Sequence, residues 1–308
     1  MINYIIRRLL LSSVLALILV AIVFFLLRTV VPGDPVILLA GDHATPEMIE
    51  QIRINQGLDK PLYVQFFIFV KNALQGDLGN SIMSKQPVTD RVLDSYPVTI
   101  RLTLYSFLYT ITLGVIIGIV TAYWQDTWLD NLVRVITVFG ASIPTFWLGL
   151  MLILIFSVWL GWLPVMGDTT SLKGLLLPAI SLGTGTAAFL ARLVRASMLE
   201  VLNSDFVRTA RAKGLHERGV VLKHALRNSL IPIITIAGFQ IGGLLGGAVI
   251  TENIFNLAGM GTLVIKGITN RDYPVIQGTV LFIAVTYLFV NLIVDVLYAY
   301  VDPRIRYD

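Results

Sequence analysis

Residues 9–27 read LLLSSVLALILVAIVFFLL, an uncharged run between Arg8 and Arg28. As an α-helix this run is about 28 Å long, which matches the hydrocarbon thickness of a bilayer. A cleavable signal peptide is the alternative, but its apolar region is shorter and ends in a small-residue cleavage site. Residues 27–32 offer no such site. The run therefore predicts a membrane-spanning helix.

The composition of the whole chain agrees with a membrane protein. Of 308 residues, 56% are hydrophobic and 14% charged, against roughly 25% charged in soluble domains. Too few ionic groups remain to solvate a globule of this size. The absence of cysteine excludes disulfides, thiolate metal sites and iron–sulfur clusters. The net charge of +4 is small and unevenly placed, which favours membrane orientation over nucleic-acid binding.

Further uncharged apolar stretches predict five more spans, at 102–124, 135–160, 175–191, 230–250 and 275–294. The third span contains Pro144, which should bend it near Ser142 and Thr145. We expect an all-α polytopic membrane protein with six transmembrane helices. Its expected parts are 1–27 (N-terminus and first span), 28–101 (external segment), 102–191 (second to fourth spans), 192–229 (cytoplasmic connection) and 230–308 (fifth span, external loop, sixth span and cytoplasmic C-terminus).

The orientation follows from where Lys and Arg collect. The 192–229 connection has eight basic and three acidic residues, a net charge of +5, whereas the connections 161–174 and 251–274 are balanced. The positive-inside rule places both termini and the basic connection in the cytoplasm. Segment 28–101 mixes seven basic with eight acidic residues, so we expect it to be solvated.

Two short helices are expected inside the external segment. Thr45 with Pro46 and Glu47 marks one helix start, and Gly57 its stop. A second helix should run from Pro61 to Gly76. Three of its aromatic residues, Tyr63, Phe66 and Phe67, are expected to pack against the membrane interface or the first helices.

The chain contains few residues of the types that usually form catalytic sites. The only histidines are His43, His216 and His224, and no span contains paired carboxylates. A hydrolase within the membrane would lack a base–nucleophile or metal constellation. No Gly-x-x-x-x-Gly-Lys-Ser/Thr loop is present. We therefore expect a chain that is not an enzyme, with any nucleotide hydrolysis supplied by a partner.

Glycines recur at a spacing of four in two predicted spans. The fifth span contains Gly238, Gly242 and Gly246, and the second contains Gly114 and Gly118. Such spacing lets two helix backbones approach closely. The partner helix could belong to this chain or to a second membrane subunit, and the spacing alone leaves both open.

Asp295 is the most conspicuous ionisable residue at membrane depth. It raises the alternative of a proton-coupled secondary transporter. Its nearness to Asp302 and the basic C-terminal end favours a structural ion pair at the cytoplasmic boundary instead. The chain also lacks an inverted pair of broken, acid-bearing helices, which weakens the secondary-transporter hypothesis.

The basic connection contains the signals of a short helix. Ser204 is a candidate N-cap, Asp205 lies in the first turn, and Arg211 and Lys213 precede a stop at Gly214. Phe206 and Ala210 are expected to form one small apolar face. A helix this short is unstable alone and needs a surface to dock on. A charged loop attracted to anionic lipid is the simpler alternative.

This connection resembles a known family. Arg208-Thr209-Ala210-Arg211-Ala212-Lys213-Gly214, followed by residues 224–232 (HALRNSLIP), is similar to the cytoplasmic signature of permease subunits of ATP-binding-cassette importers. The matching branch carries oligopeptides, dipeptides, nickel or glutathione. Further similar motifs are Pro32-Gly33-Asp34-Pro35, Gly76-Asp77-Leu78-Gly79, Ser142-Ile143-Pro144, Gly161-Trp162-Leu163-Pro164, Glu252-Asn253-Ile254-Phe255, Asp272-Tyr273-Pro274 and Asp302-Pro303-Arg304. The long segment after the first span resembles the first of the two permeases in such systems.

Two positions depart from the family pattern. The importer-wide signature usually begins Glu-Ala-Ala, where this chain has Arg208-Thr209-Ala210, as is usual in the peptide branch. Ala258 stands where the branch commonly has proline.

The resemblance implies a type I ABC importer permease fold with a small external domain after the first helix. The implied ATPase-coupling residues are Asp205, Phe206, Arg208, Thr209, Ala210, Arg211, Ala212, Lys213 and Gly214. Gly238, Gly242 and Gly246 would pack against a second permease, and Gln240, Glu252 and Pro144 are candidates for the pathway or its gate. No catalytic residue, metal or cofactor is expected on this chain, because ATP and magnesium would bind the partner ATPase subunits.

The same resemblance implies partners, location and cargo. The expected partners are a second homologous permease, two ATPase subunits, an extracellular or periplasmic substrate-binding protein and membrane lipid, with no nucleic acid. The expected location is the cytoplasmic membrane of a bacterium or archaeon. The cargo would be a dipeptide, an oligopeptide or a peptide-like solute such as glutathione, and the sequence does not distinguish among these.

Overall fold

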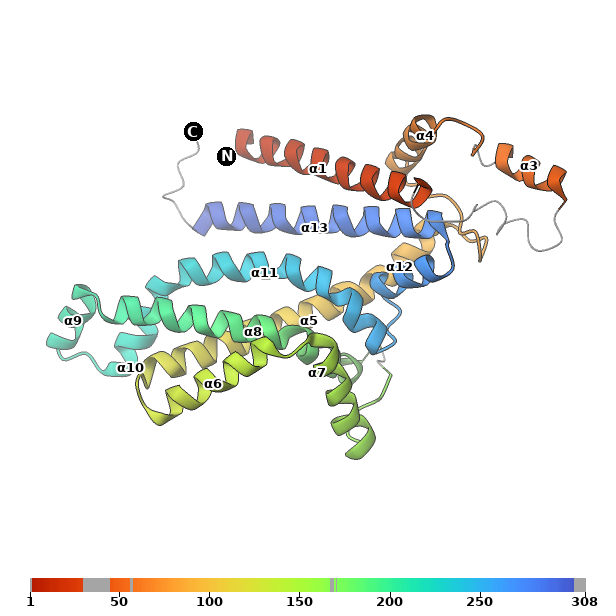
Figure 1. Cartoon of the computed structure of the whole chain (residues 1–308). Coiled ribbons are helices and arrows are strands. Elements are labelled where there is room, and N and C mark those ends of the chain that lie inside the picture. The colour runs from red at the N-terminus through yellow and green to blue at the C-terminus, as the bar shows by residue number, and fades with distance from the viewer. Residues whose placement is uncertain (1, 30–44, 56–57, 167–168, 170, 302–308) are drawn as a thin grey trace. The chain divides into compact units, whose positions relative to one another are not determined.

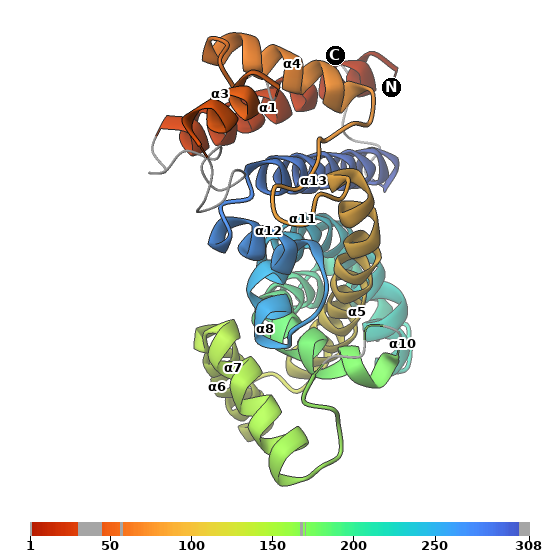
Figure 2. The same cartoon turned by 90° about the vertical axis from the view of Figure 1, so that its right-hand side faces the viewer.

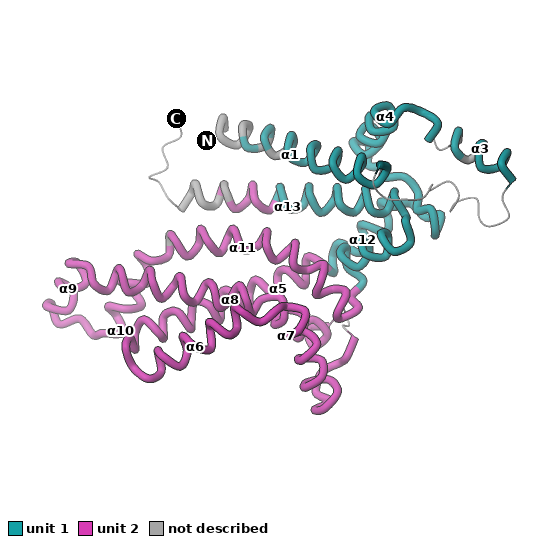
Figure 3. Tube along the Cα trace, viewed as in Figure 1, with its two compact units in different colours: residues 1–98, 258–289 teal, residues 99–257, 290–308 magenta. Residues whose placement is uncertain are grey.

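The computed structural model describes residues 2–29, 45–55, 58–166, 169 and 171–301, and they are almost entirely helical (Figure 1). The chain divides into two compact units, which Figure 3 shows in different colours. Unit 1 comprises residues 1–98 and 258–289, and unit 2 comprises residues 99–257 and 290–308.

Unit 1 contains the N-terminal helices and part of the C-terminal one. Its elements are α1 (Ile2–Thr29), α3 (Pro46–Asn55), α4 (Leu62–Leu74), the first turns of α5 (Val88–Tyr123), α12 (Met260–Thr269) and most of α13 (Tyr273–Val301). The two helices predicted in the external segment are confirmed as α3 and α4. The Phe66 ring of α4 packs edge-on against Phe24 of α1, with ring centroids 5.3 Å apart, so the predicted aromatic packing on the first helix is also confirmed.

Unit 2 contains the helices that follow. They are the rest of α5, α6 (Trp128–Ser142), α7 (Thr145–Leu152), the π-helical η1 (Ile153–Trp159), α8 (Leu172–Leu202), α9 (Asp205–Ala212), α10 (Glu217–Gly219), η2 (Val220–Ala225) and α11 (Leu226–Ile254). Figures 1 and 2 show α8 with α6 on one side and α11 on the other.

The third predicted span is broken. Helix α6 and the continuous α7–η1 segment meet at an angle of 103°. Pro144 is the N-cap residue of α7, because its ring prevents the preceding turn from continuing. The bend predicted between Ser142 and Thr145 is thus confirmed. The Ser181 hydroxyl of α8 donates to the Thr145 carbonyl at 2.9 Å, which fixes the start of α7 against α8.

The predicted count of six spans is not confirmed. Among the described residues, four helices are long and apolar enough to cross a membrane, and the broken pair α6 and α7–η1 makes a fifth candidate. Helix α1 is present. Its segment Ser13–Thr29 is apolar but too short to be counted among these four helices.

Two helices, α5 and α8, extend furthest past the uncharged stretches predicted. Helix α5 begins at Val88 because Val88 and Val92 are buried against Leu78 and Met260. Helix α8 continues to Leu202, since Val194 and Met198 extend its buried face by about two further turns. In both cases packing continues the helix past the end of the apolar run.

Helix α8 is the most enclosed of the long helices. In its most apolar window 67% of the residues are buried, against 28% in α5. The approach of these two helices depends on glycine: a Cβ on Gly114 would lie 2.9 Å from Leu190, and one on Gly118 would lie 2.4 Å from Val194. These glycines therefore pack within the chain.

Candidate coupling site and pathway residues

Helix α9 docks through one face. Val207 and Ala210 are buried and pack against Val220, with Val201 and Leu202 alongside. Of the two residues predicted to form an apolar face, Ala210 is buried within the chain, whereas Phe206 is 46% exposed. Residues three apart lie on the same helix face as readily as residues four apart. The buried face of α9 therefore contains Val207 and Ala210.

The two ends of α9 differ from each other. Ser204 occupies the N-cap position, but its hydroxyl donates to the Val201 carbonyl at 2.5 Å instead of capping the helix. The predicted position of the N-cap is therefore confirmed, while its side-chain capping bond is absent. At the other end Gly214 has φ +77°. Its N–H bonds to Arg211 O at 2.9 Å, and Leu215 N–H bonds to Ala210 O at 3.4 Å, which together form a Schellman stop.

A bidentate ion pair closes the turn after α9, and we call it the α9 ion pair. Arg211 Nη2 and Nε donate to the Glu217 carboxylate at 2.7 and 3.1 Å. The two side chains are 45% and 40% exposed. The hydrogen bonds from Arg211 hold the pKa of Glu217 below its ordinary value, and burial opposes this only in part.

The remaining surface of α9 faces outward. Of the nine predicted coupling residues, Ala210 is buried and Arg211 binds Glu217, while the others are exposed: Asp205, Phe206, Arg208, Thr209, Ala212, Lys213 and Gly214. Figure 1 shows α9 at one end of unit 2, where α8 ends. An exposed aromatic ring among charged side chains is typical of a protein interface.

A second ion pair joins α6 to α8, and we call it the α6–α8 ion pair. Asp130 is fully buried and accepts from Arg195 Nε at 2.9 Å and Nη2 at 2.7 Å. The Asp126 N–H also donates to Asp130 at 3.1 Å, and Arg134 lies 3.5 Å away. Sequence reasoning missed Asp130 and counted Arg195 only as a positive charge. The local signal, an acid in a first helical turn with an arginine four residues later, indicates Asp130 with Arg134 and not Arg195.

The three candidate pathway residues lie apart. Glu252 is fully buried near the end of α11 and accepts from the Thr99 hydroxyl at 2.6 Å. Gln240 lies twelve residues earlier on α11, which is about 18 Å along the helix. Both polar atoms of the Gln240 amide are buried without a hydrogen-bond partner among the described residues. Pro144 lies at the break between α6 and α7.

The three glycines of α11 have different surroundings. A Cβ on Gly238 would lie 2.3 Å from Val294 of α13 in the same unit, whereas one on Gly246 would meet open space. Gly242 is buried. Gly238 therefore packs within the chain, and a contact with a second permease at Gly246 stays a prediction.

Asp272 organises the predicted external side of unit 1. Its buried carboxylate accepts from the Ser81 hydroxyl at 2.5 Å and from Ile82 N–H at 3.0 Å, and Arg91 lies 3.9 Å away. Because these bonds join residues far apart in sequence, they fix the turn that precedes α5 to the loop that precedes α13.

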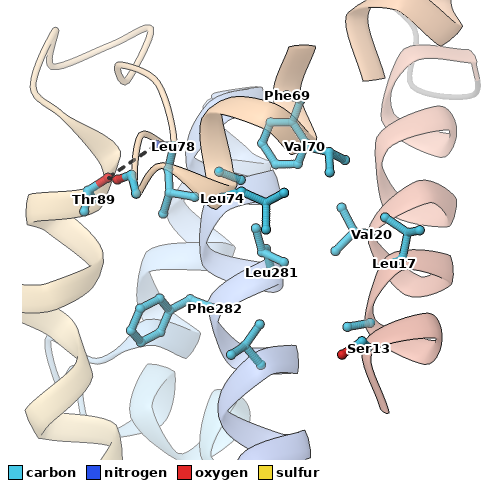
Figure 4. A pocket seen from close by; sticks show the side chains of 14 residues that line it. Ser13, Leu17, Val20, Phe69, Val70, Leu74, Leu78, Thr89, Leu281 and Phe282 are labelled. Carbon is cyan, nitrogen blue, oxygen red and sulfur yellow. Dashed lines mark hydrogen bonds between the residues drawn. The ribbon is translucent and has the colours of Figure 1, made fainter. Parts of the chain in front are cut away.

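Unit 1 also contains an apolar cavity of about 410 Å³, lined by α1, α4, the turn after α4, the start of α5 and α13 (Figure 4). Its threonine, Thr89, donates to Gly76 O at 2.8 Å and accepts from Leu78 N–H at 3.3 Å. The lining contains no charged side chain. The cavity is therefore unsuited to a peptide, whose termini and amides need polar partners.

Several predictions fall outside the described residues. They are the Pro32–Pro35 motif, His43, the stop at Gly57, the Asp302-Pro303-Arg304 motif and the side chain of Asp295. Within the described ranges no three His, Asp or Glu side chains form a group that could hold a metal ion.

These features define a helical, multi-pass membrane protein with a short docked helix available to a partner. Two family profiles match the chain. Residues 114–307 match the binding-protein-dependent transport system inner membrane component, and residues 1–103 match the N-terminal part of such membrane components. The chain belongs to this family, and it is a permease subunit of an ABC importer.

Curated relatives match along the whole chain. Glutathione transport system permease protein GsiC of Escherichia coli O6:H1 is 46% identical over 307 residues, covering 100% of both chains. The proteins of the same name from Escherichia coli K12 and Shigella boydii serotype 4 are 45% identical with the same coverage.

Solved structures support the fold. Two inward-facing structures of the MetNI methionine ABC transporter align with TM-scores of 0.58 and 0.60 at 19% identity. They cover 68% and 69% of this chain and 96% of their own. At this identity the likeness shows a type I importer permease fold and nothing about cargo.

Family membership decides several of the sequence predictions. The chain is a transport component rather than an enzyme, and it is a multi-pass inner membrane protein. Membership implies a partner permease, ATPase subunits and a substrate-binding protein. Nothing in the family or the fold supports the proton-coupled alternative at Asp295.

Proposed function

We propose that this chain forms half of an inner-membrane pathway for short peptides or peptide-like solutes such as glutathione, and that a cytoplasmic ATPase subunit drives it by binding the outward face of α9. The full-length similarity to glutathione permeases supports the cargo class. In the proposed complex two ATPase subunits act on two permeases, and both termini of this chain lie in the cytoplasm. ATP and magnesium bind the ATPase subunits.

The geometry of α9 is the observation that carries the coupling proposal. Val207 and Ala210 fix the inner face by burial, and the Schellman stop and the α9 ion pair fix the end of the helix. The outer face keeps Phe206 half exposed. A helix held in this way moves as a rigid body with α8 and η2 when a partner pushes on Phe206.

Substitution Phe206→Glu tests this proposal, with Leu222→Glu as the matched control. Both side chains are exposed apolar residues of the same connection, at 46% and 57%, so neither change should disturb folding. Buried aromatic anchors commonly contribute 2 kcal/mol or more at interfaces, or roughly thirtyfold in affinity.

The expected result is that Phe206→Glu loses most ATPase co-purification and ATP-dependent glutathione uptake, while its amount in the membrane is unchanged. Leu222→Glu should resemble the wild type. ATPase binding and uptake that persist in Phe206→Glu would exclude α9 as the ATPase contact. Uptake of another peptide but not glutathione would change only the proposed cargo.

A further inference from the structure

The α6–α8 ion pair joins two helices that continue into different elements of unit 2. Arg195 belongs to the last third of α8, which ends at Leu202, only two residues before α9 begins. Asp130 belongs to the first turn of α6, and α6 is the first half of the broken span. The pair therefore joins the helix that continues into α9 to the helix that ends at the Pro144 break.

Hydrogen bonds fix the geometry of the Asp130–Arg195 pair. Two parallel hydrogen bonds, of 2.9 and 2.7 Å, prevent the guanidinium from rotating against the carboxylate. The Asp130 side chain is 0% exposed and that of Arg195 is 20% exposed, so water competes weakly for these bonds. The Thr127 hydroxyl accepts from Asp130 N–H at 3.4 Å and caps α6 at the same point.

Further contacts keep α6 and α7 beside α8 as far as the break. A Cβ on Gly140 of α6 would lie 3.6 Å from Thr184 and 3.8 Å from Ala188, both on α8. Beyond the break, Ser181 bonds to Thr145 of α7. Along α6 the Gly140 contacts are van der Waals contacts, which resist sliding weakly. The ion pair supplies the directional restraint at the opposite end of α6.

We propose that the Asp130–Arg195 pair is a positioning device that makes α6 follow α8, so that a displacement of α9 reaches the broken span at Pro144. This inference rests on the proposed function only in taking α9 as the place where the displacement begins. It assigns to Asp130 and Arg195 a role in coupling that involves no contact with cargo or nucleotide.

A disulfide between α6 and α8 provides the test, because the chain contains no cysteine of its own. A Cβ added at position 140 would lie 3.8 Å from the Cβ of Ala188, which equals the mean for native disulfides, about 3.8 Å. The double variant Gly140→Cys with Ala188→Cys is assembled with its partner permease, ATPase subunits and binding protein. Disulfide formation is then followed with and without Mg-ATP.

The expected result is equal rates of disulfide formation in both nucleotide conditions, because α6 and α8 move together. Adding Asp130→Asn should slow disulfide formation about tenfold, since a charge-assisted hydrogen bond is lost. The control substitution Arg192→Gln removes an exposed charge one turn earlier on α8 and should not slow disulfide formation. A rate that changes with ATP when the pair is intact, or that ignores Asp130→Asn, would overturn the inference.

A functional readout separates positioning from simple stabilisation. In assembled complexes with Asp130→Asn, uptake of glutathione per ATP hydrolysed should fall about tenfold, while the amount of complex is matched to the wild type. Oxidising the cysteine pair should restore this ratio, and a reductant should reverse the rescue. An unchanged ratio in Asp130→Asn, or no rescue, contradicts the role. Failure of the wild type to move glutathione would refute only the cargo, because the disulfide rates need none.

Discussion

The α6–α8 ion pair and the α9 ion pair have nearly the same geometry in very different surroundings. Each is bidentate with a shortest bond of 2.7 Å. Asp130 is entirely buried, whereas Glu217 is 40% exposed. Water screens the exposed pair, so it orients a loop and adds little stability. In the buried pair, losing Arg195 removes the two short hydrogen bonds of the Asp130 carboxylate and leaves it in a low-dielectric site with only the Asp126 N–H and Arg134, 3.5 Å away.

The largest effect on stability is expected when the arginine of the buried pair is removed, and the same change in the exposed pair provides the comparison. Arg195→Leu should destabilise unit 2 by about 3 kcal/mol, because it leaves the Asp130 carboxylate buried. Arg211→Leu should cost less than about 1 kcal/mol. Thermal unfolding of the purified chain in detergent measures both. Equal losses from the two variants would mean that burial does not distinguish the pairs.

An intermediate effect is expected at the turn that the α9 ion pair closes. Gly214→Val places a β-branched residue at φ +77° and should cost about 1–2 kcal/mol locally. Amide hydrogen exchange in residues 210–217 should accelerate, and ATP-dependent uptake should fall. Gly219→Val is the control, because Gly219 has a helical φ and open space around its Cα. Equal exchange in the two variants would rule out the left-handed stop as the cause.

The smallest effect is the pH dependence of the α9 ion pair. The hydrogen bonds from Arg211 hold the pKa of Glu217 below its ordinary value of 4.5. The contribution of the pair is therefore complete above pH 4.5 and is lost as the pH falls through the lower, folded-state pKa. Exchange in residues 211–217, corrected for intrinsic rates, should be constant from pH 7 to pH 5 and rise in more acidic buffer. In Glu217→Gln this rise should be absent, and its persistence there would assign it to another group.

In the segment around α9, some structural features could be predicted from the sequence and others could not. Charge, the first-turn acid and Gly214 predicted a short helix and its stop, because these are local signals of a helix end. The sequence did not indicate that Val207 would be buried with Ala210, since Phe206 and Val207 are both apolar and only the position of Val220 selects between them. The position of the N-cap at Ser204 was predicted, but its hydroxyl bonds to Val201 O and makes no capping bond.

The glycine-rich helices show a second limit. Spacing of four predicted close helix approach, and Gly118 and Gly238 do approach neighbouring helices of this chain. Gly246 has the same spacing and meets open space. A periodic pattern gives the face of a helix, whereas the neighbour on that face depends on how the whole chain packs.

The sequence by itself determined that this protein crosses a membrane, where its third span bends, and to which transporter family its motifs belong. Hydrophobic length, proline geometry and charge are local properties, and each acts within a few residues. Only the tertiary structure decided which acid is buried beside which arginine, which glycines pack internally and which face of α9 remains available. Those outcomes depend on side chains 65 residues apart, as for Asp130 and Arg195, and are set by packing and desolvation that no single segment records.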